Sequence, residues 1–238
     1  TTTFIDDISF PDMCHLKMVR SPVPHAKING IDFSEAEKVP GFVRALTYKD
    51  VPKNIYTILC LIGVGPDEEP VLAEDKVMYK GEQIAAIIAE TEEAAMEAVS
   101  KTRLDLEELP AVFDVEEALK EGAPILKDWG TNYFVYEDHH CRRVRLGDID
   151  EGFAQADHIV EGRYQTGEQD HAAMEPMVSV AYFDNAERLT IHTHSQCLYF
   201  QLGQLAAIFD LPMSRIRYKG GIVGGGFGGK NHIHADHF

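Results

Sequence analysis

Residues 83–107 have the sequence QIAAIIAETEEAAMEAVSKTRLDLE, which carries in order the signals of a strand, a helix and a second strand. Gln83–Ala89 is an apolar run of strand length, and Thr91 can cap the following helix because its hydroxyl accepts a backbone N–H. Two glutamates open that helix, where negative charge is favoured. Leu104–Glu107 then alternates between apolar and charged residues, as a half-buried strand does. The short connections predict a compact α+β unit.

The residues before this stretch predict further short elements. Phe42–Thr47 has the composition of a strand. Ile31–Glu37 predicts a short helix capped by Ser34. We expect Met78 and Met96 to fill the core of this unit, not to form a binding stripe.

A composition shift follows, and a second unit is predicted after it. Gly122–Cys141 has weak periodicity and is interpreted as a linker. Asp148–Ala156 has the cap and spacing of a short helix, and Ser195 is expected to cap a longer one with its apolar face on Leu198, Leu202, Leu205 and Phe209. Strands are expected over His158–Thr166, Met177–Phe183, Arg188–His194 and Arg215–Lys219.

The last of these strands leads into Val223–Lys230, which contains five glycines around one aromatic residue. Such a backbone lets main-chain N–H groups approach a phosphate or an oxo group closely. Gly224-x-Gly226-x-x-Gly229 satisfies the dinucleotide fingerprint, although its acidic partner about 20 residues later falls beyond Phe238. The same residues with Lys230 satisfy most of a Walker A loop, but Asn231 replaces the hydroxyl residue that would hold Mg²⁺. A glycine-rich turn without a ligand is the third alternative.

Three blocks of sequence, in order, resemble the large subunit of the molybdenum hydroxylases, the xanthine dehydrogenase and aldehyde oxidase family. They are His171–Pro176, Ser195-Gln196 and Gly224–Lys230. The resemblance implies an α+β fold, with an α/β hammerhead domain followed by the first part of a molybdopterin-binding domain. We expect the hammerhead domain over residues 1–122, the linker over 123–144 and an incomplete molybdopterin-binding portion over 145–238.

The resemblance also implies the roles of individual residues. The side chain of Gln196 and the backbone N–H groups at Phe227 and Gly228 are expected near the oxo groups of molybdenum, without ligating the metal, while Gly225 and Gly226 admit the pterin. Asn231 follows Lys230 where purine-oxidising members often have Glu, so a substrate contact there is expected through an amide, not a carboxylate. We expect no catalytic residue, and no general base, in this chain.

The implied activity is hydroxylation of a purine or another N-heterocycle, as in xanthine dehydrogenase, with oxygen from water. Aldehyde oxidation within the same family is the alternative, as is a non-catalytic fragment or assembly module without cofactor. The implied cofactor is molybdenum–molybdopterin, with a dinucleotide form left open. Iron–sulfur and FAD groups are expected on partner subunits or missing regions, together with the remaining molybdopterin domain or subunit. Alone, this chain is expected to be inactive.

The composition of the chain limits which other binding partners are expected. The net charge is −17 over 238 residues, which argues against nucleic acid and against an anionic membrane surface, because both attract basic proteins. The four cysteines are far apart and form no CxxC pair, so neither a disulfide framework nor a zinc site is expected. With no signal peptide or membrane span in the sequence, we expect the cytoplasm. His171 and Glu175 are expected to form a buried polar pair, since Pro176 disfavours the helix on which a metal pair would sit.

Overall fold

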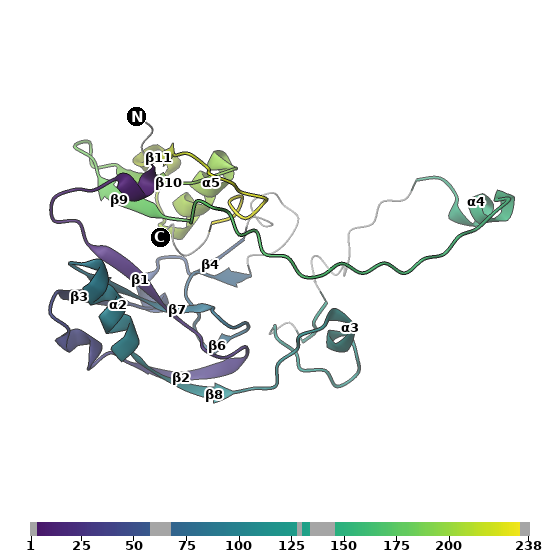
Figure 1. Ribbon diagram of the computed structural model, residues 1–238, viewed down its shortest axis with the longest axis horizontal. Coiled ribbons are helices and arrows are strands. Elements are labelled where there is room, and N and C mark those ends of the chain that lie inside the picture. Colours follow the sequence, from purple (N-terminus) through teal and green to yellow (C-terminus); the bar gives the residue numbers. More distant parts are fainter. Residues whose placement is uncertain (1–3, 58–67, 128–129, 134–145, 234–238) are drawn as a thin grey trace.

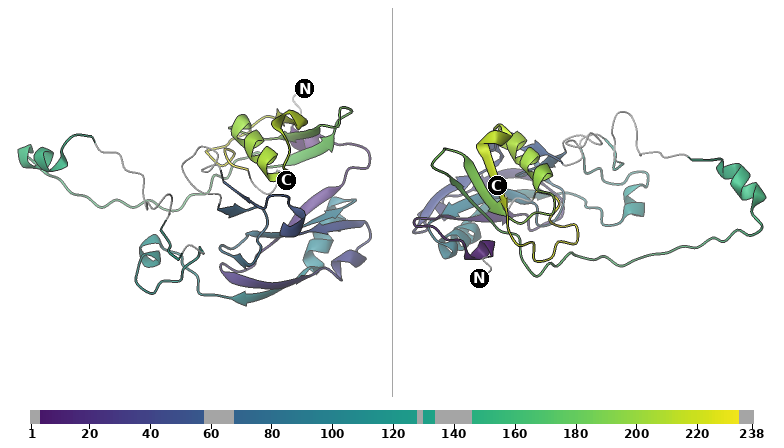
Figure 2. Two further views of the ribbon diagram at one scale, coloured as in Figure 1. Left: turned by 180° about the vertical axis from the view of Figure 1, so that it is seen from behind. Right: turned by 90° about the horizontal axis from the view of Figure 1, so that it is seen from above.

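The computed structural model describes residues 4–57, 68–127, 130–133 and 146–233. Within these ranges, the strands form three three-stranded sheets and one two-stranded sheet. Figure 1 shows the sheets gathered in one body, from which an extended arm carries the helix α4 (Ile149–Gln155) outward. In Figure 2, left, the sheets formed by the N-terminal residues lie in one part of this body, and the C-terminal sheet lies in another.

The first unit is built from short strands and one long helix. Its strands are β1 (His15–Arg20), β2 (Ala26–Asp32), β3 (Phe42–Leu46), β4 (Ile55–Tyr56), β5 (Glu69–Pro70), β6 (Lys76–Val77), β7 (Gln83–Ala89) and β8 (Arg103–Glu108). The helices are η1 (Ile5–Asp7), η2 (Ala36–Lys38), η3 (Tyr48–Asp50), α2 (Glu92–Lys101) and α3 (Val115–Ala118).

The strand β7 lies between β1 and β3 and runs antiparallel to both. Ala85, Ile87 and Ala89 pack in one cluster with residues of α2, whereas Ile84 packs in a second cluster with residues of β2, β6 and β8. Burial on both faces explains the uninterrupted apolar run in the sequence of this strand. The predicted cap of α2 is confirmed, because the Thr91 hydroxyl accepts a hydrogen bond from the Ala94 N–H.

The second unit is a sheet covered by one helix. Its elements are β9 (Ser179–Phe183), β10 (Leu189–Thr193), α5 (Leu198–Ile208), η4 (Met213–Arg215) and β11 (Ile216–Gly220). The central strand β10 pairs antiparallel with β9 and parallel with β11, and α5 makes the crossover between the parallel strands. Thr193 is paired with Gly220, so the chain leaves both strands at the same edge of the sheet.

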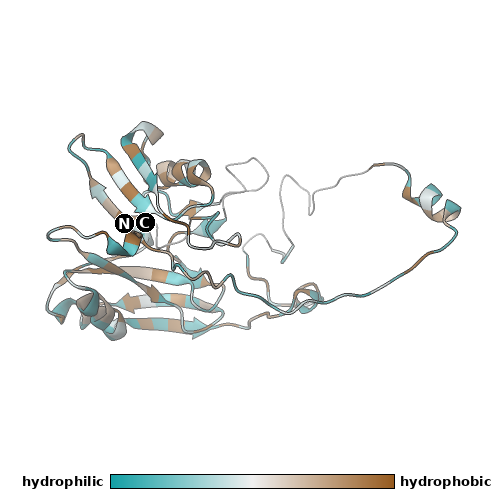
Figure 3. Ribbon diagram, turned by 45° about the horizontal axis from the view of Figure 1, so that its top comes forward, coloured by the Kyte–Doolittle hydropathy of each residue, from teal (hydrophilic) through white to brown (hydrophobic). Residues whose placement is uncertain are grey.

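The two units share a hydrophobic core. Buried residues of β10, α5 and β11 cluster with residues of the first unit, namely Tyr56, Val71 and Leu72. The Tyr56 hydroxyl also donates a hydrogen bond to the Ile233 carbonyl at 2.9 Å. Figure 3 shows hydrophobic positions recurring along the strands and α5, and also along the arm. On the arm these side chains are exposed; they include Leu146, Ile149, Phe153, Ile159 and Val160.

Several predictions of local structure are wrong. His158–Thr166 alternates like a strand but forms none, because no strand of the described chain lies beside it to supply hydrogen bonds. Ile31 and Asp32 belong to β2, and Ser34 caps no helix; the residues after it form only η2. Ser195 does not cap α5, because the cap residue of this helix is Cys197, which makes no side-chain capping hydrogen bond. Met96 is 57% exposed and is not a core residue.

Candidate functional site

The glycine loop, defined here as Val223–Lys230, leaves the sheet just after β11 and has an unusual backbone. Gly224, Gly225, Phe227 and Gly228 have φ values of +56°, +96°, +51° and +92°. A left-handed conformation costs an L-residue about 1–2 kcal/mol, so contacts around the loop must hold Phe227 there. Successive N–H groups in such a backbone form a concave nest that suits an anion or an oxo group.

The loop is folded tightly around side chains from earlier in the chain. A Cβ atom on Gly226 would lie 2.4 Å from the Gln196 Cδ, and one on Gly224 would lie 2.2 Å from the Glu175 Cβ. These glycines are therefore required by close packing inside the protein. Gly228 differs, since the nearest atom to a Cβ there is 4.0 Å away, on the His171 ring.

Gln196 lies between the end of β10 and the start of α5, and the loop orients its side chain. The Gln196 N–H donates to the Lys230 carbonyl at 2.9 Å, and the Lys230 N–H donates to the Gln196 Oε1 at 3.1 Å. Because a backbone N–H can only donate, the amide atom beside it must be the oxygen. The Nε2 group is then left as a donor, and in the part of the chain that the structure describes it has no acceptor.

The neighbouring backbone offers donors as well. Phe227 and Gly228 are exposed, and within the described ranges their N–H groups donate to no acceptor. The structure thus places Gln196 against the loop, with its amide beside Gly226 and Lys230. The set contains N–H donors that have no acceptor within the described ranges, and N–H donors are what an oxo group or another anion requires.

Lys230 is turned into the protein behind the loop. It is 2% exposed, and its Nζ donates to the Glu175 carbonyl at 2.8 Å and to the Val223 carbonyl. Burial lowers the pKa of Lys230, and the nearby Glu175 carboxylate opposes that shift. A Walker A lysine must reach the phosphates of its nucleotide. Here the ammonium is held by carbonyl groups of the protein, which argues against that interpretation.

The expected pair of His171 and Glu175 does not form. His171 is exposed, and the Glu175 Oε1 lies 3.1 Å from the Nε2 of His194, which is fully buried at the end of β10. The segment is not helical, so a spacing of four residues does not bring the two side chains together. Sequence spacing alone could not have indicated His194.

Asn231 lies beside the start of α5. Its N–H donates to the Gly228 carbonyl at 3.2 Å, and its Oδ1 accepts a hydrogen bond from the Cys197 Sγ at 3.3 Å. Asn231 is half-buried. It is therefore close in the chain and in space to the loop, and it presents a neutral amide there.

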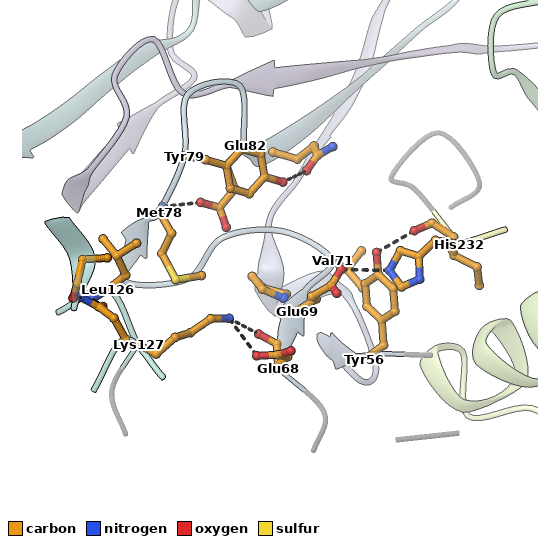
Figure 4. A pocket seen from close by; sticks show the side chains of 15 residues that line it. Tyr56, Glu68, Glu69, Val71, Met78, Tyr79, Glu82, Leu126, Lys127 and His232 are labelled. Atoms are coloured by element: carbon orange, nitrogen blue, oxygen red, sulfur yellow. Dashed lines mark hydrogen bonds and ion pairs between the residues drawn. The ribbon is translucent and has the colours of Figure 1, made fainter. Parts of the chain in front are cut away.

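A cavity of about 640 Å³, which the sequence did not predict, lies where the first unit meets the end of the described chain (Figure 4). His232 stacks on Tyr56, and its Nε2 lies 2.9 Å from the Glu69 Oε2. Burial raises the pKa of Glu82, which also lines this cavity. None of Gln196 and Gly225–Gly228 lines it, so it is separate from the donor set of the loop.

The described residues contain neither a cluster of metal ligands nor a membrane span. No group of three or more His, Cys, Asp or Glu side chains among them could hold a metal ion. None of their helices has the length and apolar character needed to cross a bilayer.

Comparison with known proteins places most of the chain in two families of domains. Residues 1–110 match the model described as "Aldehyde oxidase and xanthine dehydrogenase, a/b hammerhead domain", and residues 133–237 match "Molybdopterin cofactor-binding domain".

Relatives and a solved structure agree with these matches. The chain is 36% identical to the nicotinate dehydrogenase large molybdopterin subunit of Eubacterium barkeri, covering 97% of this chain and 52% of the relative. It is also 36% identical to a probable xanthine dehydrogenase subunit from Bacillus subtilis, covering 97% of this chain and 29% of that protein. The aldehyde oxidoreductase of Desulfovibrio gigas superposes with a TM-score of 0.81 at 31% identity, covering 92% of this chain and 25% of that one. The chain thus spans about half the length, or less, of these relatives.

Proposed function

Since the chain belongs to the aldehyde oxidase and xanthine dehydrogenase family of molybdenum hydroxylases, we propose that Gln196 and the glycine loop form one wall of a molybdopterin site. The observation that carries this proposal is the orientation of the Gln196 amide. The Lys230 N–H donates to the amide oxygen, so the Nε2 group is left to donate to a ligand. The exposed N–H groups at Phe227 and Gly228 add to this donor set.

The residues present fit the molybdopterin cofactor. When bound, this group supplies the two-electron oxidation of substrate with oxygen taken from water. The chain's own part is to orient it: the Gln196 Nε2 and the N–H groups of Phe227 and Gly228 would donate to oxo groups. Donors fixed before the cofactor arrives stabilise its charge without reorganisation of the protein. Gly225 carries no side chain, so the backbone there can approach the pterin closely, whereas at Gly226 the space that a Cβ would take is filled by the Gln196 amide.

We propose an N-heterocycle as the substrate, because the two relatives above are named for dehydrogenases of nicotinate and xanthine. Asn231 would contact it through a neutral amide, hydrogen-bonded to Cys197. An aldehyde is the second candidate, since the fold also superposes on an aldehyde oxidoreductase. The general base and the rest of the cofactor shell would come from other regions or subunits, as would the iron–sulfur and FAD groups. This chain alone would then be inactive.

The test is metal and pterin analysis of the chain purified in complex with its natural partner subunits. We expect molybdenum and a pterin in the complex, and turnover of nicotinate or a purine in ¹⁸O-labelled water with one labelled oxygen in the product. Gln196→Ala should lower both the molybdenum content and turnover. Gln155→Ala, which changes an exposed glutamine on α4, is the matched control and should change neither.

The possible outcomes separate the alternatives. Oxidation of aldehydes but of no N-heterocycle would replace the first substrate class by the second. A complete complex without molybdenum or pterin would refute the cofactor site and favour a non-catalytic assembly module.

A further inference from the structure

The proposed function assigns no role to Lys230, the last residue of the glycine loop. Its ammonium returns to the first residue of the same loop, where it donates to the Val223 carbonyl. A second hydrogen bond, of 2.8 Å, reaches the carbonyl of Glu175. One buried side chain therefore ties together both ends of the loop and the segment that packs under it.

The backbone of Lys230 is equally engaged. Its N–H donates to the Gln196 Oε1 at 3.1 Å, and its carbonyl accepts from the Gln196 N–H at 2.9 Å. The same carbonyl also accepts from the Gln201 Nε2 of α5 at 3.1 Å. The position of Lys230 thus sets which atom of the Gln196 amide faces a ligand.

From this geometry we propose that Lys230 is a positioning residue that fixes the conformation of the glycine loop. The Phe227 and Gly228 N–H groups and the Gln196 amide are thereby oriented before the cofactor binds. The inference rests on the proposed function of the loop. Lys230 acts through other residues and does not touch the ligand itself.

The chemistry of lysine suits this role. An ammonium has three donors and no acceptor, so it can satisfy several carbonyl groups at once. Hydrogen bonds from a charged donor are about twice as strong as neutral ones. A buried cation also needs compensation, which the two carbonyls and the nearby Glu175 carboxylate provide. The positive charge of the ammonium adds to the attraction of the loop for an anionic group.

The backbone strain at Phe227 explains why the loop conformation needs stabilisation by Lys230. Its φ of +51° is unfavourable for a bulky residue, and the ring is 75% exposed, so side-chain packing does not hold it. Without the hydrogen bonds of the Lys230 ammonium, we expect the loop to relax toward ordinary backbone angles, so that its N–H donors no longer keep their relative positions.

The test compares Lys230→Met with Lys219→Met in the complete complex. Methionine keeps the length and apolar volume of lysine but removes the ammonium. Lys219 is the matched control, because it is a half-buried lysine on β11 whose Nζ lies 3.3 Å from the His192 Nε2, outside the loop. The readouts are amide hydrogen exchange at Gln196, Gly229 and Lys230, whose N–H groups are hydrogen-bonded, molybdenum content, and the Mo(V) electron paramagnetic resonance spectrum of the reduced complex.

For Lys230→Met we expect exchange faster by about tenfold or more at these three amides, as the loss of two hydrogen bonds from a charged donor implies. We also expect lower molybdenum content and an altered Mo(V) spectrum in the fraction that still holds metal. Lys219→Met should match the wild type in all three. A Lys230→Met complex with wild-type exchange and spectrum would overturn the proposal. So would a lower thermal midpoint with an unchanged spectrum, since that indicates a structural role only.

If Lys230→Met does not fold, Lys230→Gln keeps one shorter donor and serves in its place. For Lys230→Gln, hydrogen exchange faster than in the wild type together with an altered Mo(V) spectrum would support the positioning role of Lys230. Wild-type exchange and a wild-type spectrum would overturn it. If the wild-type complex contains no molybdenum, the proposed function fails, while hydrogen exchange still decides whether Lys230 holds the loop.

Discussion

Replacing Gly226 by Ala should displace the Gln196 side chain without unfolding the protein. A Cβ atom at this position would lie 2.4 Å from the Cδ, 2.5 Å from the Oε1 and 2.9 Å from the Nε2 of Gln196. These atoms form the far end of a flexible side chain, so the amide can swing away. Gly226 does not have a positive φ, and alanine therefore adds no left-handed strain.

The cost follows from the hydrogen bond that the displacement breaks. The N–H of the buried Lys230 would lose its acceptor, and an unsatisfied buried donor costs about 1–3 kcal/mol. Replacing Gly by Ala returns about 0.4–1 kcal/mol by restricting the unfolded chain. The net loss is then about 0–2.6 kcal/mol, with a centre near 1.3 kcal/mol, so the thermal midpoint should fall by about 3–5 °C for a chain of this size.

The effect on the cofactor should be larger than the effect on stability. Removing one hydrogen bond to a charged or strongly polar group weakens binding by about 10- to 100-fold. The assay measures molybdenum per complex after dialysis, beside thermal unfolding by circular dichroism. Gly30→Ala is the control, because a Cβ there meets no atom within 4 Å. Full molybdenum content in Gly226→Ala, or a crystal structure with the Gln196 amide unmoved, would refute the reasoning.

Three further changes test the electrostatics and the caps. Thr91→Ala removes the acceptor of the Ala94 N–H and should lower the free energy of unfolding by about 1 kcal/mol; an unchanged urea midpoint would contradict this. Burial raises the pKa of Glu82 from 4.5, so its charged form destabilises the fold as pH rises above 4.5. Glu82→Gln should therefore raise the thermal midpoint at pH 7 and lose this advantage below pH 4.5; equal midpoints at pH 7 would count against it. Hydrogen bonds from Arg188 lower the pKa of Asp184 from 3.8 to about 2, so the stabilisation is present above pH 3.8 and is lost as pH falls toward 2. Arg188→Met removes the side-chain hydrogen bonds and should raise the Asp184 pKa toward 3.8 in an NMR titration, and a pKa that stays near 2 would exclude the Arg188 side chain as the cause.

Much of the local structure could be predicted because it depends on neighbouring residues. The elements β7, α2, β8 and β10 are found close to where periodicity and capping place them. Their assembly could not be predicted in the same way. β7 and β8 flank α2 in the chain but belong to different sheets, and this choice depends on strands far away in sequence.

Side-chain exposure and strand pairing also depend on residues far away in sequence and could not be predicted from local patterns. Met96 has the character of a core residue but faces solvent, because α2 buries the face that carries Ala94, Ala95 and Ala98. His158–Thr166 has the alternation of a strand, yet a strand exists only where another supplies hydrogen bonds. The domain boundaries and the roles of the site residues stay predictions.

The sequence by itself determined which polar groups the site contains. Glycine is the residue that takes a positive φ at no steric cost, so the run after Ile222 already indicated a loop with accessible N–H groups. The side-chain amide at position 196 was equally recognisable as a donor. The resemblance to the family also followed from the sequence, because His171–Pro176, Ser195-Gln196 and Gly224–Lys230 occur in the order that the family has.

Only the tertiary structure decided which way those groups face. Gln196 receives its orienting hydrogen bond from a residue 34 positions later, and the Lys230 ammonium finds the Glu175 carbonyl 55 positions earlier. The parallel pairing of β10 with β11 brings these segments to one edge of the sheet. A side chain's donors acquire a direction from partners that folding brings near, and spacing along the chain does not specify them.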